Sequence, residues 1–117
     1  MYVKRSENIP RESVGAGKDV SRQVLIGPNV GPNFAMRRFI IEPGGYMPMH
    51  TNTVEHEQYV LRGQASVKIG EEVYDVKDGD VVFIPAGVPH NYTTVGDIAF
   101  EFLCMVPNNE DVIKIIE

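Results

Sequence analysis

The stretches EPGGYMPMHTNTVEHEQYVLRG (Glu42–Gly63) and GDVVFIPAGVPH (Gly79–His90) decide how this chain is interpreted. Every histidine in the sequence falls inside them: His50 and His56 in the first, His90 in the second. Imidazole is the commonest metal ligand among protein side chains. Three histidines gathered in two spaced motifs, with none left over, therefore predict a metal site.

Outside and between these motifs the chain is a series of short extended segments, each ended by Gly, Pro, Asn or Asp. They span residues 20–26, 34–41, 58–61, 65–69, 72–76, 81–84 and 98–106. Breakers at such intervals indicate an all-β sandwich or barrel. No convincing helical periodicity precedes residue 108. We expect the apolar tail 111–117 to form a helical turn or a short strand that covers a sheet edge or meets a second subunit.

Composition narrows the class of protein. A chain of 117 residues has room for one domain with one core. Its net charge of −5 argues against a nucleic-acid or anionic-membrane surface, since both need clustered Lys and Arg. The single cysteine, Cys104, cannot form an internal disulfide. The N-terminus shows no signal peptide and no apolar run is long enough to span a bilayer, so we expect a cytoplasmic protein.

Strand parity predicts which side chains face inward, because residues two apart share a face. In segment 34–41 the more apolar face includes Arg37, which would then need a partner or an open cavity mouth. His50 and Asn52 share a face if their stretch is extended. The last long segment has an apolar face that looks like a barrel lining, formed by Phe100, Phe102, Cys104 and Val106.

The two motifs resemble those of the cupins, small β-barrels of the double-stranded β-helix, or jelly-roll, type. The usual family motifs are Gly-x5-His-x-His-x3 or 4-Glu-x6-Gly and Gly-x5-Pro-x-Gly-x2-His-x3-Asn. Here they read Gly44-x5-His50-x-Asn52-x3-His56-x6-Gly63 and Gly79-x5-Pro85-x-Gly87-x2-His90. The resemblance implies one cupin domain over residues 1–117. Its motif-bearing core spans about 34–106, with N-terminal strands in 1–33 and a C-terminal tail at 107–117.

The sequence departs from the family pattern at three positions. Asn52 replaces the second histidine, His56 replaces the glutamate, and Thr94 replaces the late asparagine. Carried over by position, the resemblance implies the ligands His50, His56 and His90, with Asn52 at the fourth place. Asn52 would bind directly, bind through a water or leave that position open. Its alternative role is as a turn residue, where Asn is common.

A set of three imidazoles and an amide contains no anionic ligand. No ligand would therefore neutralise the positive charge of a bound divalent metal. Such a centre should attract an anionic chelating ligand, and it lacks the glutamate that would act as a general base. We expect one divalent transition metal per chain. The resemblance favours Mn or Fe, and imidazole ligands also suit Ni, Cu and Zn.

The resemblance favours a metal-dependent oxidoreductase of dioxygenase type acting on a small, chelating, oxygenated substrate. The alternative is a non-catalytic cupin module that binds a small ligand or a metal as a sensor or accessory protein. A sugar isomerase or epimerase ranks lower, because all three histidines are committed to motif positions. Cupins of this type look like homodimers, so we expect a homodimer whose other partner is a small molecule.

Five side chains are expected to line the pocket beside the metal: Arg37, Met47, Val54, Phe102 and Cys104. Filling a gap in the core is the simpler role for Met47. Cys104 is either a small buried hydrophobe or a thiol facing the metal. The glutamates on either side of His56 should lie on a solvated face, since their parity is opposite to that of the histidine.

Overall fold

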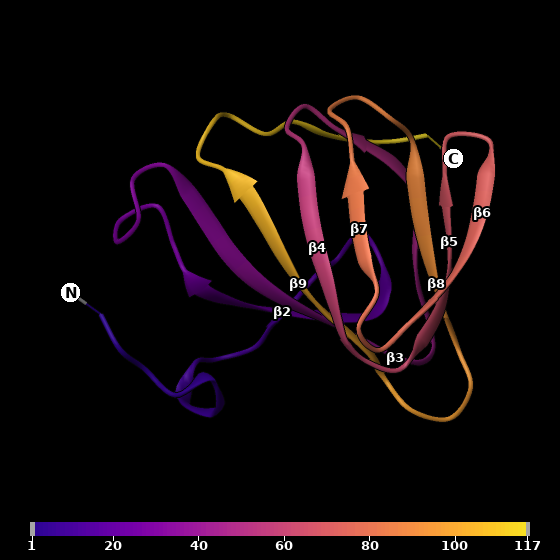
Figure 1. Ribbon diagram of the computed structural model, residues 1–117, viewed down its shortest axis with the longest axis horizontal. Helices are drawn as coiled ribbons and strands as arrows, with labels where there is room; N and C mark the ends of the chain where they lie inside the picture. Colours follow the sequence, from indigo (N-terminus) through magenta and orange to yellow (C-terminus); the bar gives the residue numbers. More distant parts are fainter. Residues whose placement is uncertain (1, 117) are drawn as a thin grey trace.

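The computed structural model describes residues 2–116, which fold almost entirely as β-strands (Figure 1). The strands are β1 (Glu12–Ser13), β2 (Lys18–Ile26), β3 (Phe34–Asn52), β4 (His56–Arg62), β5 (Gln64–Ile69), β6 (Glu72–Lys77), β7 (Val81–Ile84), β8 (His90–Val95), β9 (Phe100–Pro107) and β10 (Ile113–Ile115). A short 3-10 turn, η1 (Ser6–Asn8), precedes them. The predicted all-β class is confirmed. Within the described part of the chain no helix is long and apolar enough to cross a membrane.

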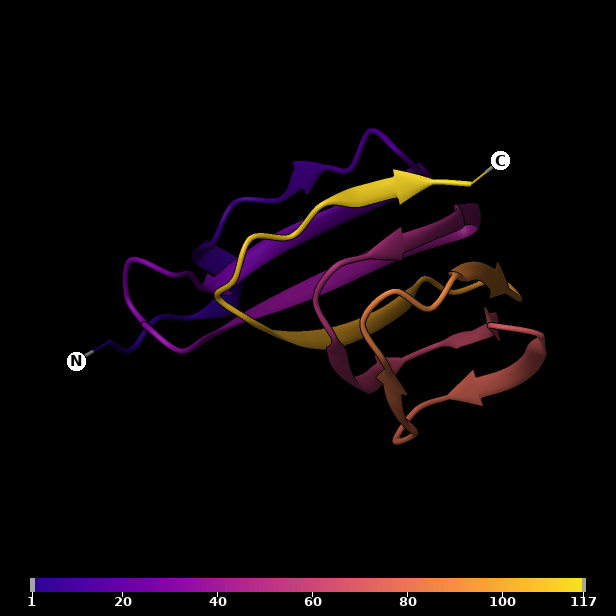
Figure 2. The same cartoon turned by 90° about the horizontal axis from the view of Figure 1, so that it is seen from above.

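The strands form one curled antiparallel sheet with the order β6-β5-β8-β3-β9-β4-β7. β2 and β10 also pair with β3, and β1 pairs with β2. Figure 1 and Figure 2 show the sheet curving round until β4 and β7 face β5 and β6 across an enclosed interior. The predicted barrel is therefore confirmed, and its interior is where a site has to be sought. Residues 1 and 117, the outer limits of the predicted domain, lie outside the described range.

The long strand β3 is the central strand of the barrel, because four other strands pair with it. Its first half, to Ile41, lies between β2 and β9, and its second half pairs with β8 and with β10. The prediction that this segment ends at Ile41 is wrong. Pro43 and Gly44 produce a bend instead of a stop, because Gly44 takes a left-handed conformation with φ of 82°. Because the strand continues past this bend, His50 and Asn52 lie on the same strand as Arg37.

The strands β8 and β9 also differ from the sequence prediction. β8 was not predicted, although its Tyr-Thr-Thr-Val run is rich in residues that favour strands. β9 begins at Phe100 rather than at residue 98. The tail forms a short strand, β10, on the edge of β3, which agrees with one of the two expected forms.

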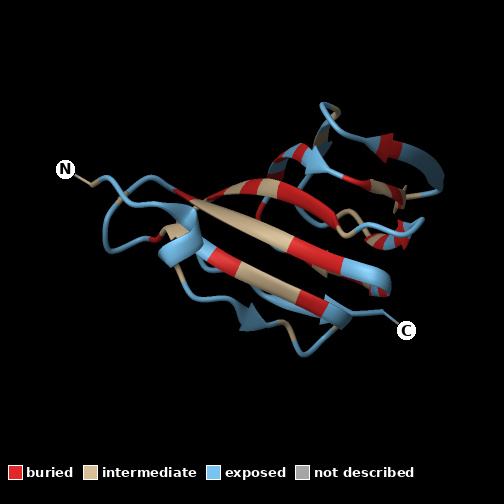
Figure 3. Cartoon of the chain, turned by 90° about the horizontal axis from the view of Figure 1, so that it is seen from below, coloured by how far each residue is buried: buried red, intermediate tan, exposed pale blue. Residues whose placement is uncertain are grey.

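Side chains alternate inward and outward along the strands, as Figure 3 shows by burial. On β4, the inward positions His56, Gln58 and Val60 are buried while the residues between them are exposed. The hydrophobic core comprises Val20, Ala35, Ile41, Met47, Val54, Val60, Ala65, Val67, Val76, Ile84, Tyr92, Phe100, Phe102, Cys104 and Val106. Gly63, the last motif glycine, is required where β4 turns into β5, since a Cβ there would lie 2.3 Å from the Ala99 carbonyl oxygen.

Candidate metal centre

Three strands bring the four predicted ligands to one end of the barrel. His50 and Asn52 lie at the end of β3, His56 begins β4 and His90 begins β8. His50 and His90 are direct cross-strand partners with ring centroids 4.2 Å apart, and the His56 ring is 5.8 Å from that of His90. All four side chains are buried and border one cavity.

Backbone carbonyls fix the orientation of two imidazoles. The Nδ1 atom of His50 lies 2.8 Å from the Pro48 carbonyl oxygen, and that of His90 lies 2.9 Å from the Val88 carbonyl oxygen. A carbonyl only accepts, so Nδ1 donates in both rings. The lone pair is then on Nε2, the nitrogen left for a metal, in the arrangement by which outer partners usually orient metal-binding histidines.

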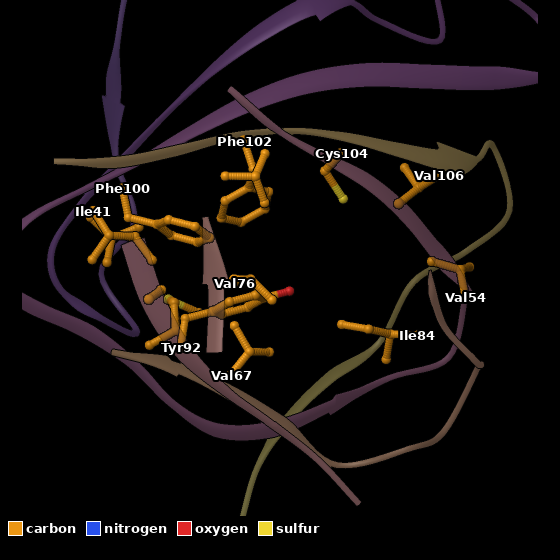
Figure 4. Packing of buried hydrophobic residues seen from close by; sticks show 14 of the residues in the cluster. Ile41, Val54, Val67, Val76, Ile84, Tyr92, Phe100, Phe102, Cys104 and Val106 are labelled. Carbon is orange, nitrogen blue, oxygen red and sulfur yellow. The ribbon is translucent and has the colours of Figure 1, made fainter. Parts of the chain in front are cut away.

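The third imidazole is oriented by a thiol. Nδ1 of His56 lies 3.1 Å from the Cys104 sulfur, and the sulfur accepts from Arg37 Nη2 at 3.5 Å and from Gln58 Nε2 at 3.7 Å. Figure 4 shows Cys104 pointing into the barrel. Cys104 is fully buried in the hydrophobic core and its sulfur contacts His56, so the side chain has features of both expected roles. Burial raises the pKa of Cys104, an effect that the charge of Arg37 partly opposes.

Asn52 is oriented by an acidic residue from the tail. Its Nδ2 donates to the carboxylate of Asp111, at 3.2 and 3.4 Å from the two oxygens, and the same carboxylate accepts from Thr53 N at 3.1 Å. With the amino group held there, Oδ1 of Asn52 is buried and has no hydrogen-bond partner. The amide therefore offers a carbonyl oxygen, the half of the group that can bind a cation.

Three buried polar atoms at this site lack a hydrogen-bond partner among residues 2–116: Nε2 of His56, Nε2 of His90 and Oδ1 of Asn52. Leaving such atoms unsatisfied costs about 1–3 kcal/mol each. Nε2 of His90 and Oδ1 of Asn52 are acceptors, and Nε2 of His56 is one when its Nδ1 carries the proton, so a shared cation would satisfy all three in that tautomer. No group of three His, Cys, Asp or Glu side chains within residues 2–116 is already spaced to hold one ion, so the donors would have to move closer together to bind one. Imidazole and amide groups are donors that a divalent metal accepts.

Burial keeps two of the imidazoles neutral. It lowers the pKa of His56 from 6.5 to about 3, helped by the charges of Arg37 and the other two histidines. It lowers the pKa of His90 to about 4, although the bond to the Val88 carbonyl acts in the opposite direction. Neutral imidazole is the form that binds metals, so these two rings are ready as ligands at neutral pH.

The cavity beside the histidines has a volume of about 60 Å³, roughly the share of two water molecules in the liquid. Its walls include Arg37, Met47, Phe102 and Cys104. A larger surface hollow of about 680 Å³, bordered by β6 and β7, contains none of the histidines.

Val54 is buried in the hydrophobic core and is not among the side chains that border this cavity, so its place beside the metal stays a prediction. Burial alternates from Asn52 through Val54 to His56, with Thr53 and Glu55 exposed between them.

The sequence interpretation missed four polar residues of the cavity wall: Arg22, Gln58, Tyr92 and Asp111. Tyr92 and Gln58 share a face with His90 and His56, so parity along each strand was a usable signal. Their side chains meet, with Gln58 Nε2 donating to the Tyr92 hydroxyl at 2.7 Å. Asp111 gave no local signal, because only the pairing of β10 with β3 brings it to Asn52.

Comparison with known proteins matches residues 37–106 to the family model described as Cupin_2: Cupin domain. A curated relative from Rhodospirillum rubrum, named 1-methylthio-D-xylulose 5-phosphate methylsulfurylase, is 33% identical over 94 residues, which are 80% of this chain and 60% of that protein. The chain thus spans less than two thirds of that relative's length.

Solved structures give the same architecture. The polyketide cyclase RemF from Streptomyces resistomycificus superposes with a TM-score of 0.92 at 26% identity, over 100% of this chain and 86% of that one. A predicted oxalate decarboxylase from Thermotoga maritima superposes with a TM-score of 0.82 at 24% identity, over 91% and 98% of the two chains. The second likeness supports the fold alone.

Proposed function

Because this chain belongs to the cupin family, we propose that it is a metal-dependent oxidoreductase of dioxygenase type acting on a small, chelating, oxygenated substrate. His50, His56 and His90 would hold one divalent metal, with Asn52 at the fourth place. The observation that carries this proposal is the set of buried, unpartnered polar atoms on His56, His90 and Asn52. Metal binding is common among cupins, and Mn or Fe suits this chemistry, while Ni, Cu and Zn also accept imidazole ligands.

A bound metal supplies Lewis acidity and open positions at which an oxygenated substrate and dioxygen can meet. The chain's own residues set the surroundings. Neutral donors leave the positive charge of the ion uncompensated, which favours an anionic substrate. Phe102 and Met47 give the cavity apolar walls that exclude water. Burial raises the pKa of Tyr92, so its hydroxyl stays protonated and able to donate a hydrogen bond at neutral pH.

The names of the relatives do not fix the reaction. A methylsulfurylase, a polyketide cyclase and a predicted oxalate decarboxylase name three different chemistries on similar chains. The substrate of this protein therefore has to be inferred from its own cavity.

Oxygen consumption tests the proposal. Protein loaded with Fe or with Mn is mixed with diketones, catechols and thiols, and oxygen uptake is recorded. We expect uptake with at least one compound in a metal-loaded form and none in metal-free protein or in His56→Ala. Silence across the panel in both metal forms contradicts the oxidoreductase proposal.

A non-catalytic ligand-binding module is the second candidate, and one observation favours it. The one carboxylate among the described residues of the cavity wall belongs to Asp111, and it already accepts from Asn52 and Thr53. The cavity thus lacks a free carboxylate base. Thermal stabilisation by a small ligand that is never turned over would support this function, whereas rapid turnover of any bound ligand would remove it.

The state of assembly and the cell compartment belong to the same proposal. We propose a cytoplasmic homodimer that takes a small molecule and binds neither nucleic acid nor membrane. A monomeric mass in light scattering contradicts the dimer.

A further inference from the structure

Arg37 lies inside the barrel, and no residue of the described range 2–116 forms an ion pair with it. It sits on β3 opposite Cys104 on β9, which in turn sits opposite Gln58 on β4, so the three side chains form a row across neighbouring strands. Within residues 2–116 the ion pairs of arginine involve other positions. We propose that Arg37 is the carboxylate anchor of this cavity: it binds the carboxylate of a small 2-oxo or 2-hydroxy acid whose other oxygen reaches the metal. The inference rests on the proposed metal centre and names its substrate class.

The free donor is on the edge of the guanidinium that suits a carboxylate. Nε of Arg37 is buried and has no hydrogen-bond partner. Nη2, on the same edge, donates only to the Cys104 sulfur at 3.5 Å, and a thiol is a weak acceptor. A carboxylate binds such an edge through two parallel hydrogen bonds. An anionic substrate would satisfy Nε and replace a weak acceptor with a strong one.

The neighbours of Arg37 fix where this edge lies. The guanidinium carbon is 5.2 Å from the centre of the Phe39 ring, which holds one face of the group. The sulfur that accepts from Nη2 also lies 3.1 Å from Nδ1 of His56, so one thiol links the guanidinium to a predicted metal ligand. Arg37 and the imidazoles border the same cavity. A ligand with two oxygenated groups on adjacent carbons can therefore reach both.

Arg22 is the other arginine of the cavity wall, and it already has an acidic partner. Its Nε donates to Glu12 at 2.9 Å. Because Arg22 borders the cavity, the matched control is Arg11, which lies outside the cavity wall with Nη1 3.8 Å from the Glu42 carboxylate. Because the cavity volume is about 60 Å³, an anion fits without movement of the walls only if it has a few non-hydrogen atoms.

The test is a binding titration on the whole chain. Co²⁺-loaded wild type, Arg37→Gln, Arg37→Lys and Arg11→Gln are first measured for metal content and melting temperature. Each is then titrated with oxalate, pyruvate and uncharged oxamide, followed by calorimetry and by the visible Co²⁺ spectrum. The same titrations on metal-free protein show whether Arg37 holds the anion by itself.

We expect Arg37→Gln to keep its metal and to bind oxalate and pyruvate about 10- to 100-fold more weakly. Arg37→Lys should fall in between, because it keeps the charge and loses the paired donors. Arg11→Gln should bind as wild type does, and oxamide should not discriminate among the proteins. Equal anion affinity in wild type and Arg37→Gln would overturn the anchor, as would the absence of anion binding by metal-loaded wild type. If Arg37-dependent binding occurs without oxygen uptake, the anchor stands and the oxidoreductase function fails.

Discussion

The interior of the barrel has two ends that differ in chemistry although the same strands build both. We call them the histidine end and the apolar end. Along β4 the inward row runs from Val60 through Gln58 to His56, and along β9 it runs from Phe100 through Phe102 to Cys104. Every one of these side chains is buried. An inward-facing position is therefore not always apolar. Its place along the strand determines whether it lies at the histidine end or at the apolar end.

Stacked aromatic rings separate the two ends. The ring of Phe102 lies 5.1 Å from that of Tyr92 and 5.3 Å from those of Phe39 and Phe100, centroid to centroid. On one side of this layer the buried groups are mostly apolar, and the buried Thr94 hydroxyl donates to the Ile41 carbonyl oxygen at 3.0 Å. On the other side buried nitrogens and an amide oxygen lack partners, an arrangement that costs stability unless a ligand satisfies them.

The histidine end should make the metal-free protein sensitive to acid. The folded pKa values of His56, about 3, and His90, about 4, lie below the ordinary 6.5. Above pH 6.5 both rings are neutral in the folded and the unfolded chain, so their contribution is fully present. Below it only the unfolded chain takes up protons, and the free energy of unfolding falls by about 1.4 kcal/mol per pH unit for each ring that stays neutral.

Urea unfolding of metal-free protein between pH 7 and pH 4 measures this loss, which should reach several kcal/mol. His56→Asn should show a shallower pH dependence, because one of the two rings is gone. A flat profile between pH 7 and pH 4 would mean that the two imidazoles are not held neutral by burial.

At the apolar end a cavity should matter more than charge. Phe100→Ala removes a ring that is 1% exposed, and such truncations cost about 3–5 kcal/mol. The loss should appear in denaturant unfolding and should not depend on pH. The metal content of the folded fraction should stay at the wild-type level. Loss of metal in folded Phe100→Ala would show that the two ends are not independent.

Asp111→Asn tests how the tail supports the histidine end. It removes the carboxylate that holds the amino group of Asn52, which frees the amide to turn its oxygen away. Loss of such an outer partner typically weakens metal affinity about 10- to 100-fold. Glu110→Gln is the matched control, because its neighbour Thr53 uses only the backbone oxygen of Glu110. Equal metal affinity in the two variants would remove Asp111 from the site.

The smallest effect is expected outside the barrel. Glu57 follows His56 directly, yet its side chain is exposed. Glu57→Gln should change the free energy of unfolding by no more than about 0.5 kcal/mol and should leave metal affinity unchanged. A large loss of metal would contradict the inward and outward assignment of β4.

These two ends also show what the sequence predicts and where it stops. Parity along β9 identified the buried row from Phe100 to Val106, because a regular strand keeps its alternation. The Pro-Gly-Gly run after Ile41 predicted a strand end wrongly, because β3 continues through Gly44. Motif spacing named all four residues that the structure gathers at the histidine end.

The partners of those residues were less predictable. Cys104 lies 48 residues from His56 in the chain, and Asp111 lies 59 residues from Asn52. Only strand pairing brings them together, so no local pattern points to either contact. Motif spacing can therefore indicate a ligand set, whereas the groups that orient the ligands depend on the register of the folded sheet.

The central claim is that the histidine end is a metal site, and elemental analysis tests it most directly. Protein purified without a chelating tag is analysed for Mn, Fe, Ni, Cu and Zn beside His56→Ala and Glu57→Gln, with circular dichroism to show that all three are folded. We expect about one ion per chain in wild type and Glu57→Gln and a large loss in His56→Ala. Metal-free wild type that takes up none of these ions on reconstitution, or His56→Ala with full metal content, would contradict the account.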